Sequence, residues 1–342
     1  MEAEPPKVQP EPNENEINAK STTIEITSPK DASKFDELIK SNNFEDNVEI
    51  LTLSNINLTS LEFLKNEHFK KIIILELKNC FLSTLENISD LPELRHLDLS
   101  TNKISGLDQI SQKEFNELEV LVLPNNIIES LATIKDCKFP KLKKLDLSNN
   151  KIYSITDLTA NVSLTELESL YLNQNFIESI NDLEKAKFTK IKELQLTCNR
   201  IENIDVFAKV EFKELTELYL RDNQIKDISQ LVKGKLEKLE ELSLGKNQIE
   251  DIKCLKEANW CNLKKLDFFD NQIKDVEVFK DIFDNLEELD LSFNKIKKES
   301  FSIFDKRPIK EFNKEHNEEE EEGENEEKKE EKNEVDIEFK EE

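Results

Sequence analysis

Three side chains with the chemistry of a nucleophilic triad lie close together in the chain: His96, Asp98 and Ser100. Their spacing of two residues places all three on one face if the segment is a β-strand. Nucleophilic catalysis also needs an oxyanion site and a pocket, and no motif for either accompanies them. The other histidines, His68 and His316, are scattered, and with only four glycines the chain contains no phosphate-binding loop. We therefore predict that the protein is not an enzyme and attribute the group to chance.

The five cysteines show no spacing typical of a metal site or of disulfide pairing. Cys254 and Cys261 lie close in sequence, but no third or fourth ligand accompanies them. The remaining cysteines, Cys80, Cys137 and Cys198, are isolated. This pattern favours reduced thiols and an intracellular protein, cytoplasmic or nuclear. We predict no metal ion and no cofactor.

These residues are all positioned by a repeated unit, Leu-x-x-Leu-x-Leu-x-x-Asn-x-Ile, of which residues 215–225 are one copy. Its period, mostly 24 residues, and its strand-like core are typical of a leucine-rich repeat. We predict an α/β solenoid with a parallel sheet on its concave side and helical or irregular segments on its convex side. Repeats 1 to 11 begin at Val48, Ile72, Leu94, Leu118, Leu142, Leu167, Ile191, Leu215, Leu239, Leu263 and Leu286.

The ninth position of the unit predicts a ladder of buried amides. An asparagine amide both donates and accepts, so it can satisfy backbone groups where the chain leaves each strand. Ile56 and Cys80 replace asparagine in the first two repeats, and a degenerate first copy is typical of a terminal repeat. The predicted ladder consists of Asn102, Asn126, Asn150, Asn175, Asn199, Asn223, Asn247, Asn271 and Asn294.

Candidate binding residues come from positions that the fold leaves on the concave surface. The third, fifth and seventh positions alternate with the buried fourth and sixth, so they face outward. The fifth position holds mainly acids and tyrosines, and aromatic residues beside acids are typical of binding hot spots. The candidate partner-binding residues are Asp98, Asp146, Tyr171, Tyr219, Arg221, Asp267, Phe269, Asp290 and Phe293.

Two of these assignments have open alternatives. Asp267 and Asp290 occupy the same column of adjacent repeats, so a basic partner would relieve their repulsion; the alternative is that each acid is simply solvated. Phe269 and Phe293 are expected side by side at the C-terminal end of the concave face. The alternative for Phe293 is that the C-terminal segment folds over it as part of a cap.

The flanks differ in composition from the repeats. Residues 1–34 are rich in Glu, Pro, Asn and Lys, so we predict disorder there, except that the alternation in residues 23–26 is compatible with an edge strand. Residues 35–47 are predicted to hold a cap helix, with Asp31 or Ser33 as its N-cap. The solenoid with its C-terminal cap is assigned to residues 48–312, and residues 313–342 to a disordered acidic tail whose segment 335–339 is a candidate docking peptide.

The formal net charge of −26 indicates which partners the chain attracts. A chain this acidic repels nucleic acid and anionic membranes and attracts basic proteins. No apolar run approaches the roughly 20 residues needed to span a bilayer. We therefore expect a monomeric protein that binds protein partners with a basic patch.

The spacing of apolar residues after the ninth position, as in Asn150, Ile152, Ile155 and Leu158, resembles the intracellular leucine-rich repeats of the protein phosphatase 1 regulatory subunit 7 class. The resemblance covers residues 48 to about 300 and implies a curved, non-catalytic solenoid that binds partners on its concave face. The residues compatible in type with that family's contacts are Asp98, Asp146, Tyr171, Tyr219 and Asp267. That family's repeats are typically 22 residues long, and its terminal cap sequence is absent after Ile296.

The acidic tail resembles a second family, the acidic leucine-rich nuclear phosphoproteins, which bind histones and have about half as many repeats. The predicted function is a protein-interaction scaffold or regulatory subunit, with a phosphatase as the first partner class. The alternatives are a nuclear protein that binds histones or other basic proteins through its tail, and an axonemal or cytoskeletal adaptor.

Overall fold

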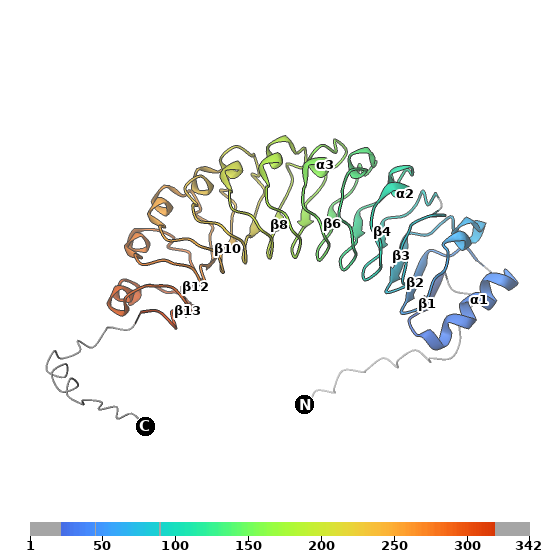
Figure 1. The fold of residues 1–342 in the computed structure, drawn as a ribbon, viewed down its shortest axis with the longest axis horizontal. Coiled ribbons are helices and arrows are strands. Elements are labelled where there is room, and N and C mark those ends of the chain that lie inside the picture. The colour runs from blue at the N-terminus through green and yellow to red at the C-terminus, as the bar shows by residue number, and fades with distance from the viewer. Residues whose placement is uncertain (1–21, 45, 89, 319–342) are drawn as a thin grey trace, which may run out of the picture.

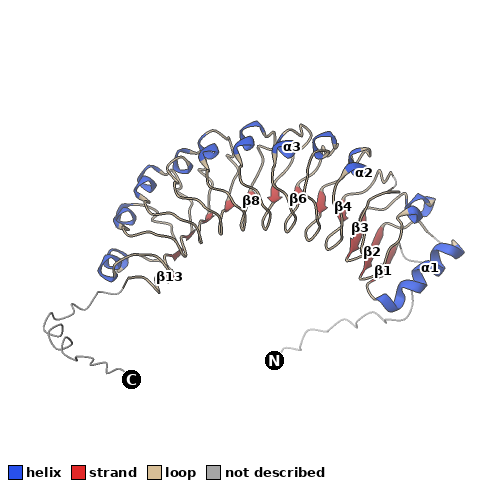
Figure 2. Cartoon of the chain, viewed as in Figure 1, coloured by secondary structure: helices blue, strands red, loops and turns tan. Residues whose placement is uncertain are grey.

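A computed structural model describes residues 22–44, 46–88 and 90–318. In this part of the chain the coils stack into an arch, with the strands along its inner edge (Figure 1). Short helical turns lie along the outer edge (Figure 2). The predicted fold class, a solenoid with a parallel concave sheet, is confirmed. Residues 1–21 and the acidic tail after Glu318, including segment 335–339, lie outside the described residues.

The strands of the described residues form one parallel sheet in sequence order, so consecutive coils are always neighbours. Each predicted repeat supplies one strand, from β2 to β12. The strands are β1 Thr23–Ile26, β2 Ile50–Ser54, β3 Ile74–Lys78, β4 His96–Asp98, β5 Val120–Val122, β6 Lys144–Asp146, β7 Ser169–Tyr171, β8 Glu193–Gln195, β9 Glu217–Tyr219, β10 Glu241–Ser243, β11 Lys265–Asp267, β12 Glu288–Asp290 and β13 Glu311–Asn313.

The outer edge is built mainly from short helical turns, with longer segments near the two ends. The α-helices are α1 Ala32–Ser41, α2 Asp108–Ser111 and α3 Thr156–Thr159. The 3-10 turns are Pro29–Asp31, Glu62–Lys65, Glu67–Phe69, Ile134–Asp136, Asn181–Lys185, Asp205–Ala208, Leu231–Lys233, Lys253–Glu257, Glu277–Asp281 and Lys298–Phe304. None of the helices in the described ranges has the length and apolarity that a bilayer span requires.

The core is continuous because every coil contributes the same inward positions. In repeat 8, Leu218 in β9 and Leu220 directly after it, together with Ile228 and Leu231 on the outer side of the coil, are all inaccessible to solvent. Large apolar residues three positions before repeats 2 to 11 add a second column, most of which is buried. Two of them, Trp260 and Phe283, stack with ring centroids 6.0 Å apart. One repeat alone would leave these faces exposed, so stacking provides the driving force for folding.

The asparagine side chains at the ninth position join neighbouring coils. The Asn223 amide nitrogen donates to the carbonyls of Leu196 and Leu220, both at 3.0 Å, and its oxygen accepts from the Ile201 backbone nitrogen at 3.0 Å. The same pattern recurs from Asn102 to Asn294. In repeat 2 the Cys80 thiol lies 3.3 Å from the Leu53 carbonyl, which matches the weak hydrogen bond expected of this substitute.

The eighth position has a conformational requirement that the sequence analysis missed. In every repeat this residue has a positive φ, between 49° and 59°, which turns the chain out of the strand. Asparagine tolerates this left-handed region better than most residues, and it occupies four of these positions. The column consists of Asn55, Asn79, Thr101, Asn125, Asn149, Gln174, Cys198, Asp222, Lys246, Asp270 and Phe293.

The N-terminal end is ordered earlier than the predicted boundary at residue 34. The edge strand at residues 23–26 is confirmed as β1, which pairs in parallel with β2. The cap helix begins at Ala32, and Asp31 occupies its N-cap position, one of the two predicted. Its carboxylate makes no capping hydrogen bond and instead pairs with Lys34 at 2.7 Å. Phe35 is buried and packs edge-on against Phe63, so α1 covers the open end of the first coil.

The C-terminal end continues past the predicted boundary at residue 312 into a twelfth coil. β13 pairs with β12, and Phe304 packs against Phe312. Asn317 extends the ladder: its oxygen accepts from the Ile296 nitrogen at 3.1 Å, and its nitrogen donates to the Leu291 carbonyl at 2.9 Å. The sequence obscured this coil because Lys314 stands at the sixth position, where an inward leucine is the rule.

Candidate functional site

The four aspartates predicted to face a partner all serve the fold. One carboxylate oxygen of each accepts the backbone N–H two residues later, where the chain leaves the strand. This contact is a local turn that asparagine and aspartate form readily. The residues are Asp98, Asp146, Asp267 and Asp290.

Asp98 differs most from the prediction that these aspartates face a partner. It is 6% exposed, and its second oxygen lies 3.2 Å from the Lys78 ammonium. A carboxylate buried beside its own cation is not presented to a partner. Asp146, on β6, accepts a second hydrogen bond from the Ser148 hydroxyl at 2.6 Å, so its exposed surface is also reduced.

Tyr171 and Tyr219 are half-buried on the concave sheet, and each hydroxyl donates to a glutamate in the third column. Tyr171 donates to Glu193 at 2.5 Å, and Tyr219 donates to Glu217 at 3.0 Å. Burial and these carboxylates raise the pKa of both tyrosines well above the ordinary value, so both stay protonated hydrogen-bond donors. The Lys144 ammonium lies 4.3 Å from the centre of the Tyr171 ring.

Arg221 reaches across repeat 9 to join repeats 8 and 10. Its guanidinium donates to Asp267 at 2.9 Å and lies 4.4 Å from the centre of the Phe269 ring. Gly245 makes this crossing possible, because a Cβ there would lie 2.7 Å from both the guanidinium and the Asp267 carboxylate. Asp267 therefore has a basic partner within its own chain, an arrangement that the sequence analysis did not foresee.

Phe269 and Phe293 lie side by side as predicted, with ring centroids 5.2 Å apart. The alternative of a covering cap holds in part. The His316 ring lies 4.3 Å from the Phe293 ring, centroid to centroid, yet Phe293 remains 45% exposed. Arg221, the two phenylalanines and His316 thus form one partly exposed aromatic group, which we call the aromatic edge.

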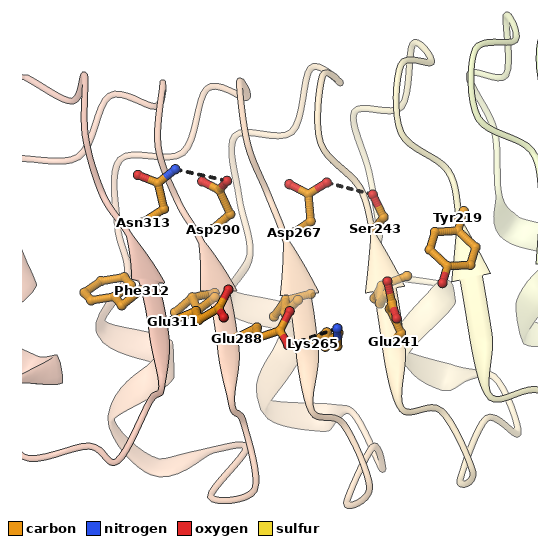
Figure 3. Close-up of a pocket in the computed structure, with 13 residues that line it drawn as sticks. Tyr219, Glu241, Ser243, Lys265, Asp267, Glu288, Asp290, Glu311, Phe312 and Asn313 are labelled. Carbon is orange, nitrogen blue, oxygen red and sulfur yellow. Dashed lines mark hydrogen bonds and ion pairs between the residues drawn. The ribbon is translucent and has the colours of Figure 1, made fainter. Parts of the chain in front are cut away.

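The concave face is hollowed between β9 and β13, where a pocket encloses about 470 Å³ (Figure 3). Strand register places the residues at the third position of neighbouring repeats side by side. Glu241 lies beside Lys265, and Lys265 lies beside Glu288. The pocket, which we call the acidic groove, is lined by Tyr219, Glu241, Leu242, Ser243, Lys265, Leu266, Asp267, Glu288, Leu289, Asp290, Glu311, Phe312 and Asn313.

Five carboxylates and one lysine line the acidic groove. Lys265 is paired with Glu288 at 2.9 Å, and Arg221, from outside the groove lining, is paired with Asp267 at 2.9 Å. Two of the five carboxylates therefore have a basic partner within the chain. Burial raises the pKa of Glu241, and the neighbouring Glu217 and Glu288 raise it further. The groove therefore carries excess negative charge that a cation would stabilise.

Of the predicted residues, the acidic groove contains Tyr219, Asp267 and Asp290. Asp98, Asp146 and Tyr171 lie on strands nearer the N-terminus. Sequence analysis missed the third-column acids, which alternate with the buried leucines in the same way as the fifth column and which the same reasoning would have identified. It also missed β13, which supplies Glu311, Phe312 and Asn313.

Comparisons with known proteins agree with this architecture. A family described as Leucine Rich repeats (2 copies) matches residues 165–209, 213–257 and 261–305, and one described as Leucine rich repeat matches residues 92–152. No curated protein matches by sequence.

Several solved structures share this fold. An internalin from Listeria monocytogenes is 24% identical with a TM-score of 0.67, over 79% of this chain and 76% of that one. A leucine-rich repeat protein of Leptospira interrogans is 21% identical with a TM-score of 0.55, over 86% and 89% of the two chains.

A third similar structure is the ectodomain of the Arabidopsis thaliana receptor kinase GASSHO1/SCHENGEN3, solved with CASPARIAN STRIP INTEGRITY FACTOR 2. It is 20% identical with a TM-score of 0.56, over 80% of this chain and 36% of that one. At these identities the likeness concerns the fold alone. Repeats, ladder and family matches together identify the chain as a leucine-rich repeat protein.

Proposed function

We propose that the protein is a non-catalytic interaction scaffold that binds a partner protein in the acidic groove. The observation that carries this proposal is the groove itself: a hollow of about 470 Å³ on the concave face, lined by five carboxylates, one lysine and two aromatic residues. A lysine or arginine side chain of a partner supplies the charge that the groove lacks. The partner surface that fits best therefore carries a basic patch.

The aromatic edge supports the same location. Tyrosine and phenylalanine provide large contact area with few rotatable bonds, and interface hot spots are enriched in tyrosine and arginine. Phe269 and Arg221 are held in place by each other, so little conformational entropy is lost when a partner covers them. Since Asp267 contributes to both regions, we treat the acidic groove and the aromatic edge as one surface.

A protein phosphatase catalytic subunit is our first candidate partner, because the repeats resemble those of a phosphatase regulator. We place this scaffold inside the cell, in the cytoplasm or nucleus, as a monomer that does not bind nucleic acid or membranes. A second function is favoured by one observation, the fifteen acids between Glu318 and Glu342: histones would then bind the tail. A cytoskeletal or axonemal adaptor is the further alternative.

Binding of purified phosphatase catalytic subunit and of histones, each measured by calorimetry, distinguishes these functions. The proteins are the full chain, a chain ending at Glu318, and the full-length double variant Tyr219→Ala/Phe269→Ala. The truncation keeps Asn317, which completes the last coil.

A phosphatase that binds the first two chains and not the double variant supports the proposal. Its affinity should depend modestly on salt, because part of the contact is apolar and buried. Histone binding that is lost with the tail, retained by the double variant and steeply salt-dependent supports the second function. A phosphatase that binds none of the three chains removes the first candidate partner.

A further inference from the structure

A second group of polar side chains lies on the concave face of repeats 2 and 3, apart from the acidic groove. Glu76 on β3 and Asp98 on β4 are register partners in the sheet. His96 precedes Asp98 by two residues on β4, so its side chain emerges on the same face. The imidazole nitrogen and the carboxylate oxygens of the three residues all lie within 4.8 Å of one another.

The protein holds both carboxylates in fixed orientations. The Thr52 hydroxyl donates to Oε2 of Glu76 at 3.2 Å, and the Ser100 backbone nitrogen donates to Oδ1 of Asp98 at 2.9 Å. The remaining oxygens, Oε1 of Glu76 and Oδ2 of Asp98, are both 3.2 Å from the Lys78 ammonium. One positive charge already lies between them, so these two oxygens converge on a cation position.

The imidazole adds a ligand that the ammonium does not use. Nε2 of His96 is buried and has no hydrogen-bond partner in the described part of the chain. Its nearest charged neighbour, Oε1 of Glu76, is 3.9 Å away, beyond hydrogen-bonding distance. A buried polar atom without a protein partner is uncommon, and such an atom can accept from a bound water or coordinate an ion.

We propose that Glu76, His96 and Asp98 bind a divalent first-row transition-metal ion, with Zn²⁺ as the ion to test. One imidazole and two carboxylates suit such ions, whereas Ca²⁺ and Mg²⁺ prefer oxygen ligands alone. Zinc ligands lie about 2.0–2.2 Å from the metal, so the three side chains must move closer by rotation. Three protein ligands leave a coordination position open to water or to a partner's side chain.

The Lys78 ammonium competes with a metal ion for this site. Its side chain is 39% exposed, so the ammonium can turn into solvent when the ion enters. The ion then replaces one positive charge with two and satisfies the imidazole nitrogen. Removing the ammonium must therefore strengthen metal binding, and removing the imidazole must weaken it.

Calorimetric titration of the full-length protein with Zn²⁺ tests both predicted changes in metal affinity. The variants are His96→Gln, Lys78→Met and, as a matched control on the remote histidine, His68→Gln. Acidic residues near the C-terminus and the cysteines are unchanged in all four proteins, so their background binding is common to them. Affinity at one site should fall roughly a hundredfold or more in His96→Gln, rise about tenfold or more in Lys78→Met and stay unchanged in His68→Gln.

Several outcomes would overturn the proposal. Isotherms that are the same for the natural protein and His96→Gln would mean that Zn²⁺ binds only elsewhere. Binding that appears only in Lys78→Met would mean that the lysine is the permanent occupant in the natural chain. Weaker binding in Lys78→Met would show that the ammonium does not compete for the site.

Discussion

Replacing Asn223 with alanine should weaken the solenoid more than its small change in volume suggests. Asn223 is buried, and its side chain makes hydrogen bonds to four backbone groups on two coils. The two carbonyls, on Leu196 and Leu220, each keep a second asparagine donor, from Asn199 and Asn247 respectively. The Arg221 carbonyl, the third acceptor, keeps the Cys198 backbone N–H. The variant therefore leaves one of these groups, the Ile201 N–H, without its hydrogen-bond partner.

The expected loss follows from these contacts. An orphaned buried N–H costs about 1–3 kcal/mol, and the loss of each of the two amide N–H donors costs about 0.5–1.5 kcal/mol. The free energy of unfolding should therefore fall by about 2–6 kcal/mol. Lys226→Ala, an exposed position of the same repeat, should change it by less than about 0.5 kcal/mol.

Urea unfolding followed by circular dichroism measures both variants, and hydrogen exchange at the Ile201 amide locates the effect. Because stability in a solenoid is a sum of neighbouring terms, exchange should accelerate most in repeats 7 and 8. A loss below about 1 kcal/mol, with the Ile201 amide protected as in the natural protein, would refute the assignment of the ladder as a main stabiliser.

Three further substitutions test other parts of the structure. Gly245→Ala should separate Arg221 from Asp267, which a crystal structure of the variant would show. The stability change should stay within about 1 kcal/mol, because both side chains of the pair are partly exposed to solvent. The pKa of Glu241 is raised in the folded protein, so its ionisation destabilises the fold as pH rises through that pKa. Glu241→Gln should therefore be about 0.2–1 kcal/mol more stable than the natural protein at neutral pH and equally stable below the ordinary pKa of 4.5. Urea unfolding at both pH values measures this difference. Arg307→Ala removes a guanidinium that donates to three backbone carbonyls, so the local free energy of unfolding at the last coil should fall by about 2–4 kcal/mol. Hydrogen exchange there should become faster, and unchanged exchange would contradict this role.

The fold could be predicted well because every repeat carries the same sequence pattern. Buried leucines and the ninth-position asparagine recur often enough to outweigh any single exception. The ends were harder to predict, since a terminal coil has a neighbour on one side only and tolerates residues such as Lys314. Asn317 is recognisable as part of the ladder only through its hydrogen bonds.

The candidate site was harder to predict from the sequence than the fold. Strand alternation identifies which side chains face outward, but not which of them the protein already uses. Asp98 and Asp290 look like free acids in the sequence, yet both accept a backbone N–H two residues later. The pairing of Arg221 with Asp267 spans 46 residues and depends on the absence of a side chain at Gly245, so it follows only from three-dimensional packing.

The most direct test of the concave-face proposal is quantitative mass spectrometry of proteins that co-purify with the full chain from cell extract. Tyr219→Ala/Phe269→Ala is compared with Tyr153→Ala, which removes a tyrosine that is 53% exposed outside the concave strands. The proposal predicts at least one partner that is lost with the double variant and retained by Tyr153→Ala and by a chain ending at Glu318. An identical set of partners for the double variant and the natural protein, or partners lost only with the tail, would contradict it.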